Sequence, residues 1–184
     1  MLLQFDLAEW KSTKGMDGSN SVSTPLDPNV HIVPNPDGNE GDRSNSYAKL
    51  LGELQYIANT TRPDIQYAVN RLASYTANPS LQHQTAIKRV LRYLSATQSH
   101  GIIYKALPEE SNFYAYADAV FMNADECRSM TGYVFLAGEG AITWNSRTQE
   151  SHALSSTGAE YVALTEAAQE ACWLRNLYLE LGLL

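Results

Sequence analysis

Apolar residues begin to recur at intervals of three and four positions at Ser46, which is the spacing of amphipathic helices, and the pattern continues to about residue 99. Three helices are predicted there. Thr61 is placed to cap the second, with Pro63 in its first turn and Asp64 three positions after the cap, and Ser80 can cap the third. The predicted buried faces are Tyr47, Leu50, Leu51, Leu54, Ile57 and Ala58 in the first helix, Ile65, Ala68, Val69 and Leu72 in the second, and Ile87, Val90, Leu91 and Leu94 in the third.

From His100 the apolar pattern changes to a period of two, which is typical of half-buried β-strands. Four runs are rich in aromatic and β-branched residues: GIIYK (101–105), FYAYADAVF (113–121), GYVFLAG (132–138) and GAITW (140–144). The last two predict a hairpin that turns at Gly138-Glu139-Gly140, and one long helix is predicted from Thr157 to Leu181, closed by Gly182. Helices, then an antiparallel meander, then a long helix indicate an α+β fold with the last helix on one face of the sheet.

Residues 12–46 are rich in proline, glycine, serine, asparagine and aspartate, a composition that does not sustain helices or strands. We expect an extended arm there, ordered only where another part of the molecule holds it. The predicted organisation is therefore an irregular arm or linker at 1–45, a helical segment at 46–99 and an α+β unit at 100–184.

The net charge of −7 argues against a protein that binds nucleic acid by charge alone, but the charge is unevenly distributed. From Ile65 to Leu107 there is no acidic residue, and the basic residues give this segment a charge of +5, which leaves −12 on the remainder. The small helical segment has one basic face. The candidate nucleic-acid-binding residues are Arg71, Lys88, Arg89 and Arg92, although a solvated helix surface explains the same pattern without a ligand.

The two cysteines, Cys127 and Cys172, lie far apart and outside any C-x-x-C spacing, so neither a zinc site nor a redox motif is indicated. The histidines are scattered along the chain. The N-terminal stretch MLLQFDLAEW is too short and too acidic for a signal peptide or a membrane span. We therefore expect a soluble intracellular protein, cytoplasmic or nuclear, with no membrane partner.

Glu160 lies in the stretch ALSSTGAEYVAL and admits two interpretations. Thr157-x-x-Glu160 fits a capping box, in which the glutamate bonds back to the residue that caps the helix. The predicted buried stripe of the same helix is Leu164, Ala167, Ala171, Leu174, Tyr178 and Leu181, and a step of four back from Leu164 reaches Glu160. Its carboxylate is then expected to point toward the sheet, where a metal ion would compensate the charge.

Asp118 is the one charged residue between Phe113 and Met122, in a run that is otherwise aromatic and aliphatic. Aspartate is depleted in β-strands, so a single aspartate in such a run calls for a reason. By alternation it shares a face of the strand with Tyr114, Tyr116 and Val120. Asp118 is therefore a candidate metal ligand and partner of Glu160, and a structural aspartate at a strand end or bulge is the alternative.

Several motifs in the second half of the chain carry a family resemblance: Tyr116-Ala-Asp118, Ser129-Met-Thr-Gly-Tyr-Val-Phe135, Gly140-Ala-Ile-Thr-Trp144, the stretch from Ala153 to Leu164, and Glu170-Ala-Cys-Trp-Leu-Arg175. They resemble the ribonuclease H domain of copia-type LTR retrotransposon Pol polyproteins. Upstream, VSTPLDPN, SYAKLLGELQYIANTTRPDIQYAVNRLA, NPSLQHQTAIKRVLRYL and GIIY resemble the segment that joins the reverse transcriptase to that domain. The resemblance covers the chain from about Ser21 to Leu184, in the family's order.

The resemblance implies a ribonuclease H-like fold and hydrolysis of the RNA strand of an RNA–DNA hybrid. In the family, clustered carboxylates hold two Mg²⁺ ions, one of which activates water while the other stabilises the leaving oxygen. By position, Asp118 and Glu160 correspond to two of these carboxylates and are the implied catalytic and metal-binding residues. This sequence departs from the family's pattern at two positions. The family often has an acidic residue at the position of Val120 and usually has glutamate at the position of Gly158.

The family's third and fourth metal-binding acids follow the long helix, and this chain has no residues that match them. We therefore expect a helical connection segment followed by an incomplete ribonuclease H-like fold, with a three-stranded antiparallel meander and one long helix. Whether the chain is an enzyme stays open at this point. We expect weak Mg²⁺ binding and little or no hybrid cleavage by this chain, because two carboxylates bind a pair of hard dications poorly.

The resemblance also implies that the first strand, FYAYADAVF, has an exposed aromatic edge. We expect a second copy of the chain, or a strand borrowed from the arm, to pair with this edge. The expected nucleic-acid partner is an RNA–DNA hybrid. Two other functions remain open: a nuclease completed by dimerisation or by a partner chain, and a non-enzymatic, domesticated nucleic-acid-binding or interaction module.

Overall fold

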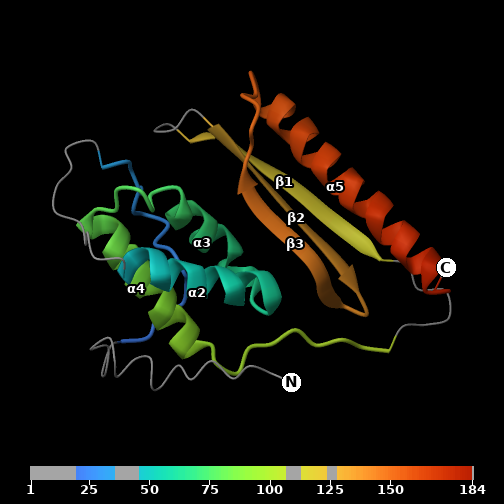
Figure 1. Ribbon diagram of the computed structural model, residues 1–184, viewed down its shortest axis with the longest axis horizontal. Coiled ribbons are helices and arrows are strands. Elements are labelled where there is room, and N and C mark those ends of the chain that lie inside the picture. Colours follow the sequence, from blue (N-terminus) through green and yellow to red (C-terminus); the bar gives the residue numbers. More distant parts are fainter. Residues whose placement is uncertain (1–19, 36–45, 107–112, 124–127, 184) are drawn as a thin grey trace.

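The computed structural model of the protein describes residues 20–35, 46–106, 113–123 and 128–183. Three helices come first, α2 (Ser46–Thr60), α3 (Gln66–Ala73) and α4 (Leu81–Ala96), with a short 3₁₀ turn, η1 (Pro63–Ile65), before α3. Three strands follow, β1 (Tyr114–Asn123), β2 (Arg128–Ala137) and β3 (Gly140–Thr148), and then the long helix α5 (Ser156–Glu180). The expected α+β class is confirmed, with a three-stranded antiparallel sheet and one long helix after it (Figure 1).

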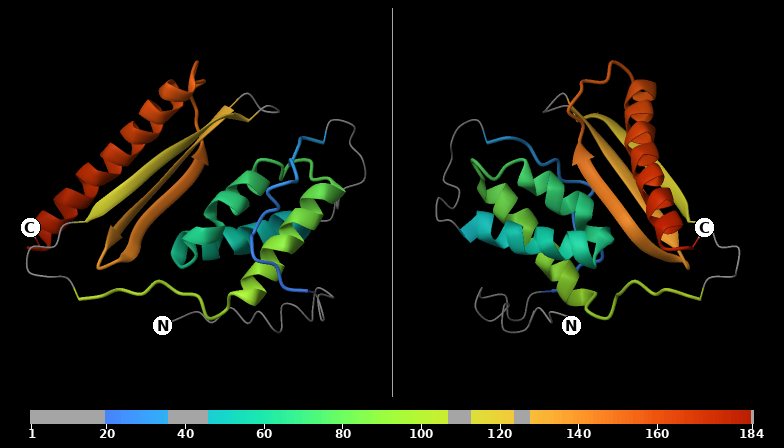
Figure 2. Two further views of the ribbon diagram at one scale, coloured as in Figure 1. Left: turned by 180° about the vertical axis from the view of Figure 1, so that it is seen from behind. Right: turned by 45° about the vertical axis from the view of Figure 1, so that its right-hand side comes forward.

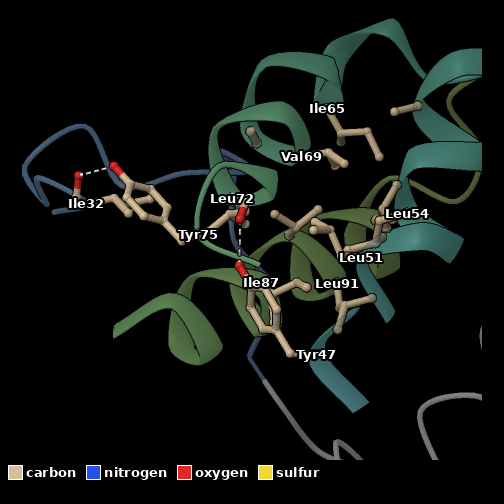
Figure 3. Packing of buried hydrophobic residues seen from close by; sticks show 14 residues of the cluster. Ile32, Tyr47, Leu51, Leu54, Ile65, Val69, Leu72, Tyr75, Ile87 and Leu91 are labelled. Atoms are coloured by element: carbon tan, nitrogen blue, oxygen red, sulfur yellow. Dashed lines mark hydrogen bonds between the residues drawn. The ribbon is translucent and has the colours of Figure 1, made fainter. Parts of the chain in front are cut away.

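Helices α2, α3 and α4 pack around one apolar core, which Figure 3 shows from close by. Leu54, Ile65 and Val90 are almost fully buried, and Tyr47 donates from its hydroxyl to the carbonyl of Leu72 (3.0 Å). The predicted faces of all three helices point into this core, with Leu50 and Ile57 at its margin. The three- and four-residue spacing of apolar side chains therefore predicts this part of the fold well.

The start of the second helix differs from the prediction. Arg62, not Thr61, precedes the first turn, and no side chain caps it. The Thr61 hydroxyl instead donates back to the carbonyl of Ile57 in α2 (3.4 Å). Ser80 does precede α4, as predicted, and its N–H donates to Nδ1 of His83 (2.8 Å).

The sheet has the order β1-β2-β3, with both pairs antiparallel. The predicted hairpin between β2 and β3 is confirmed. Its turn consists of Gly138 (φ 58°) and Glu139 (φ 65°), so both turn residues are left-handed, as in a two-residue turn that matches the twist of the strands. GIIYK forms no strand, which corrects the period-two prediction there. It meets the hairpin through one main-chain hydrogen bond, from Lys105 N–H to the Gly138 carbonyl (2.7 Å).

The sheet lies between α5 and the helical unit, as the two views of Figure 2 show. On one face, Phe135 of β2 packs against Ala167 and Leu174 of α5 in a second apolar core. On the other face, Trp144 Nε1 of β3 donates to the Ala58 carbonyl at the end of α2 (2.8 Å), and Asn70 of α3 bonds to the Ser146 carbonyl. The Trp144 side chain and the Ser146 carbonyl of β3 therefore hold the helical unit to the sheet.

The ends of α5 differ in how well they follow the prediction. Ser155 caps the helix, because its Oγ accepts from the N–H of Gly158 (3.0 Å), so Thr157 already belongs to the first turn. The predicted capping box of Thr157 with Glu160 is therefore wrong. At the other end Gly182 has a φ of 67° and closes the helix as expected. None of the helices in the described ranges is long and apolar enough to cross a membrane.

Candidate functional site

Asp118 lies near the middle of β1 and is exposed. Its Oδ1 accepts from the N–H of the next residue, Ala119 (2.8 Å). It pairs with Gly132 of β2, and by alternation it lies on the face turned away from α5, together with the exposed Tyr116 and Val120. The predicted set of residues on this face is confirmed, and none of the ion pairs found among the described residues involves Asp118.

A cavity of about 580 Å³ opens between this face of the sheet and the segment formed by η1 and the start of α3. Its wall combines Asp118 with aromatic side chains, Tyr67 of α3, Tyr116 of β1 and Trp144 of β3. Asp64 also lines it, but Arg62 donates to both of its carboxylate oxygens (2.9 and 2.7 Å) and the Tyr93 hydroxyl donates to one (2.8 Å). Burial acts to raise the pKa of Asp64, and these hydrogen bonds nevertheless hold it below its ordinary value.

Glu160 is in the first turns of α5 and is exposed, which corrects the prediction that it continues the buried stripe of this helix. The buried positions of α5 are Ala159, Ala163, Ala167 and Leu174. Leu164, from which the predicted stripe was extended to Glu160, is 58% exposed. Ala167 and Leu174 of the predicted stripe are buried, and Ala171 and Tyr178 pack against the same core, so the prediction fails only at the start of the helix, where Ala163 rather than Leu164 is buried.

Glu160 lines a second hollow of about 440 Å³, between β1 and α5. Tyr161 and Leu164 of α5 and Ala117 of β1 are also in its wall. Neighbouring residues of a strand point to opposite faces, so Ala117 faces this hollow while Asp118 faces the cavity on the other side. Asp118 and Glu160 therefore line different cavities of the described structure.

Metal-ligating side chains do not cluster among the described residues. No group of three or more histidine, cysteine, aspartate or glutamate side chains that could hold a metal occurs among them. The later glutamates of α5 face β3 instead, where Glu166 pairs with Arg147 (3.1 Å) and Glu170 accepts from the Thr143 hydroxyl (2.8 Å).

The basic residues mostly contact the arm. Arg71 is buried and donates to the carbonyl of Ile32, Arg89 bonds to Thr24 and Asp27, and Arg92 donates to the carbonyl of Asn20. Lys88 is exposed. Sequence reasoning found these cations but missed that the arm covers them, because main-chain carbonyls far away in sequence leave no signal in the amino-acid pattern.

Comparison with known proteins decides which family these features belong to. The chain is 41% identical over 138 residues, 74% of its length, to the retrovirus-related Pol polyprotein from transposon RE2 of Arabidopsis thaliana. It is 35% identical over 173 residues, 91% of its length, to the retrovirus-related Pol polyprotein from transposon TNT 1-94 of Nicotiana tabacum. The chain belongs to the copia-type retrotransposon Pol family.

This member of the Pol family spans a small part of those relatives, 9% of the RE2 polyprotein and 13% of the TNT 1-94 polyprotein. It is also 40% identical over 129 residues to the secreted RxLR effector protein 161 of Plasmopara viticola, a match that covers 70% of this chain and 90% of that protein. The segment shared with the Pol family therefore also makes up most of a shorter protein. No family model and no solved structure matches the chain.

Proposed function

We propose that this chain is the part of a copia-type Pol polyprotein that connects to, and begins, its ribonuclease H-like domain. Its role would be to contact an RNA–DNA hybrid and to contribute carboxylates to hybrid cleavage. The observation that supports this proposal best is Asp118, an exposed carboxylate without a basic partner among the described residues, held in an otherwise apolar strand beside a large cavity. A solvent-facing acid in such a strand does not stabilise the fold, so a role in a site explains it better.

Asp118 and Glu160 would be two of the metal-binding carboxylates, as the family resemblance implies. In the geometry described above they line different cavities, and Mg²⁺ prefers an octahedral set of oxygen ligands close together. The residues present thus do not fit a two-metal centre, and we derive no catalytic step through one. We propose that further carboxylates, from a partner chain or from the rest of a Pol polyprotein, are needed to complete a metal-binding centre.

Hybrid cleavage by the 184-residue polypeptide tests this proposal. With Mg²⁺ and an RNA–DNA hybrid, we expect no cleavage above that of the Asp118→Asn variant. Cleavage that Asp118→Asn abolishes would contradict the need for further carboxylates and would identify a complete nuclease. A polypeptide that neither cleaves nor binds the hybrid would contradict the proposed hybrid contact and favour a non-enzymatic interaction module.

We also propose that a second copy of the chain pairs with the outer edge of β1. This strand has β2 as its one partner within the described sheet, and Tyr116 and Val120 are 65% and 52% exposed along it. A hollow lies beside β1 on each face of the sheet, so an added strand would find room for side chains on both sides. The described arm residues contact α3 and α4 instead, so they do not cover this edge.

Light scattering tests the pairing. We expect a dimer whose dissociation constant rises at least tenfold in Val120→Lys, because a lysine on an edge strand opposes edge-to-edge pairing. Val30→Lys is the matched control, since Val30 of the arm is similarly exposed (49%) and the change in charge is the same. A monomer at all concentrations, or equal weakening by both substitutions, would contradict edge pairing.

A further inference from the structure

Residues 20–35, the described part of the arm, run over α3 and α4 without forming a helix or strand (Figure 1, blue). The second half of this segment is anchored in the core. Ile32 is 8% exposed and packs in the apolar cluster of the helical unit. Its carbonyl accepts from the Tyr75 hydroxyl (3.1 Å), drawn in Figure 3, and from Arg71 (3.2 Å).

The first half, residues 20–27, is held mainly by two arginines of α4. Arg89 donates to the Thr24 carbonyl (3.2 Å), the Thr24 hydroxyl (2.9 Å) and Oδ2 of Asp27 (3.2 Å). Arg92 donates to the Asn20 carbonyl (2.6 Å). In this half only Leu26 packs against the apolar cluster among the described residues, and it is partly buried. Residues 20–27 are therefore bound chiefly through oxygen atoms that face guanidinium groups.

The electrostatics of α4 favour an anion at this position. Lys88, Arg89 and Arg92 lie within about 100° of arc on the helix, and Lys88 is exposed. No acidic residue occurs between Ile65 and Leu107, and Asp27 is the one acidic residue in the described arm. A guanidinium group suits phosphate oxygens better than main-chain carbonyls, because its N–H donors match them as a fork and the interaction is charge-assisted.

We infer that Lys88, Arg89 and Arg92 form a binding surface for the phosphate backbone of nucleic acid, and that residues 20–27 occupy it as an internal competitor. This inference rests on the proposed contact with an RNA–DNA hybrid. The carboxylate of Asp27 and the oxygens of Thr24 stand where phosphate oxygens would bind. Binding of a hybrid then requires release of the first half of the arm, while Ile32 keeps the second half in place.

The experiment measures hybrid affinity of the full chain with Asp27→Asn as the variant. This substitution keeps Oδ1, which accepts from the Asn29 N–H (3.1 Å), and replaces the oxygen that faces Arg89 with an amide. We expect affinity at 100 mM salt to rise about two- to fivefold, the effect of losing one partly exposed ion pair.

Glu139→Gln is the matched control, because it removes one negative charge in the hairpin turn, away from α4, and should leave affinity unchanged. In an Arg89→Gln background, Asp27→Asn should have no effect on affinity. Equal affinity of wild type and Asp27→Asn, or an equal gain from Glu139→Gln, would overturn the internal competition while leaving hybrid binding intact. Failure of every variant to bind the hybrid would overturn the inference and the proposed hybrid contact together.

Hydrogen exchange provides a second measurement that does not depend on a substitution. The N–H groups of Asn29 and Val30 bond to Asp27 in the free protein, at 3.1 and 3.2 Å. Saturation with the hybrid should accelerate their exchange and leave the amides of α4 unchanged. Unchanged or slower exchange at Asn29 and Val30 in the saturated complex would show that the arm stays in place, and would overturn the competition.

Discussion

Gly158 offers a substitution whose effect can be worked out from the structure. It is the third residue of α5 after the cap Ser155, whose Oγ accepts its N–H (3.0 Å). This is the position at which a glutamate completes a capping box. A Cβ added at Gly158 would lie 3.4 Å from Ser155 Oγ and 3.8 Å from Ala153 Cβ, which is ordinary contact, so Gly158→Glu fits without displacing its neighbours.

Two effects stabilise the Gly158→Glu variant. Removing glycine from a helix contributes about 1 kcal/mol, and a carboxylate at the positive end of the helix dipole contributes about 0.3–1 kcal/mol more. The sum of roughly 1–2 kcal/mol corresponds to a rise in Tm of about 2–8 °C for a chain of this size. Thermal and urea denaturation, followed by circular dichroism, measure both quantities.

Gly158→Ala separates the two effects, because it removes the glycine without adding a carboxylate. We expect Glu to be more stable than Ala at pH 7, and the difference to vanish when the pH falls below about 4, where the carboxyl is protonated. Equal stability of the two variants at pH 7 would refute the role of the carboxylate at this helix end. A loss of stability in both would refute the placement of Gly158 inside the helix.

Three further predictions concern packing and pH. Burial, together with the nearby charge of Arg71, lowers the pKa of His83, so as the pH falls the unfolded chain takes up a proton at this residue before the folded chain does. The free energy of unfolding, measured by urea denaturation, should therefore decrease below about pH 6.5 by up to about 1.4 kcal/mol per pH unit. An equally steep decrease in the His83→Gln variant would contradict this. Trp144→Phe should cost about 1–2 kcal/mol, since it leaves the buried carbonyl of Ala58 without its donor, whereas Trp173→Phe on the exposed side of α5 should change stability by less than about 0.5 kcal/mol. Phe135→Ala should cost about 3–5 kcal/mol, because Phe135 is 1% exposed in the core beneath α5, and a smaller cost than that of Trp144→Phe would contradict the position of this core.

The sequence predicts the helical unit well for a physical reason. Leu51, Leu54 and Val90 are large, apolar and regularly spaced, so burying them in one core dictates the helices and their orientation. The hairpin is predictable for a similarly local reason, since Gly138 and Glu139 form a two-residue turn between two runs in which apolar residues alternate.

The orientation of α5 is harder to predict because alanines make its contact with the sheet. Ala159 and Ala163 are buried, while the larger Leu164 is exposed, so a stripe drawn through the largest apolar residues is displaced by one position at the start of the helix. That displacement placed Glu160 in the predicted buried stripe, although the residue is exposed. GIIYK was predicted as a strand for a related reason, because alternation shows which faces a segment has but not whether a partner strand pairs with it.

The candidate site was only partly accessible from sequence. Asp118 stands out because a charged residue in an apolar strand is unusual, and the sequence also predicts the residues that share its face of the strand. Its cavity could not be foreseen, because Tyr67 and Trp144 reach it from elements far apart in the chain. The partners of Arg89 and Arg92 were equally hidden, since Thr24 and Asn20 contribute main-chain carbonyls, which every residue has.

Hybrid cleavage by a chimera tests the proposed place of this chain in a Pol polyprotein most directly. The 138 matching residues of the RE2 polyprotein are replaced by the corresponding residues of this chain, and the unaltered RE2 polyprotein serves as the reference. We predict Mg²⁺-dependent cleavage of an RNA–DNA hybrid within tenfold of the reference, lost in chimeras that carry Asp118→Asn or Glu160→Gln. Cleavage that survives both substitutions, or a folded chimera that is inactive while the reference cleaves, would contradict the proposal.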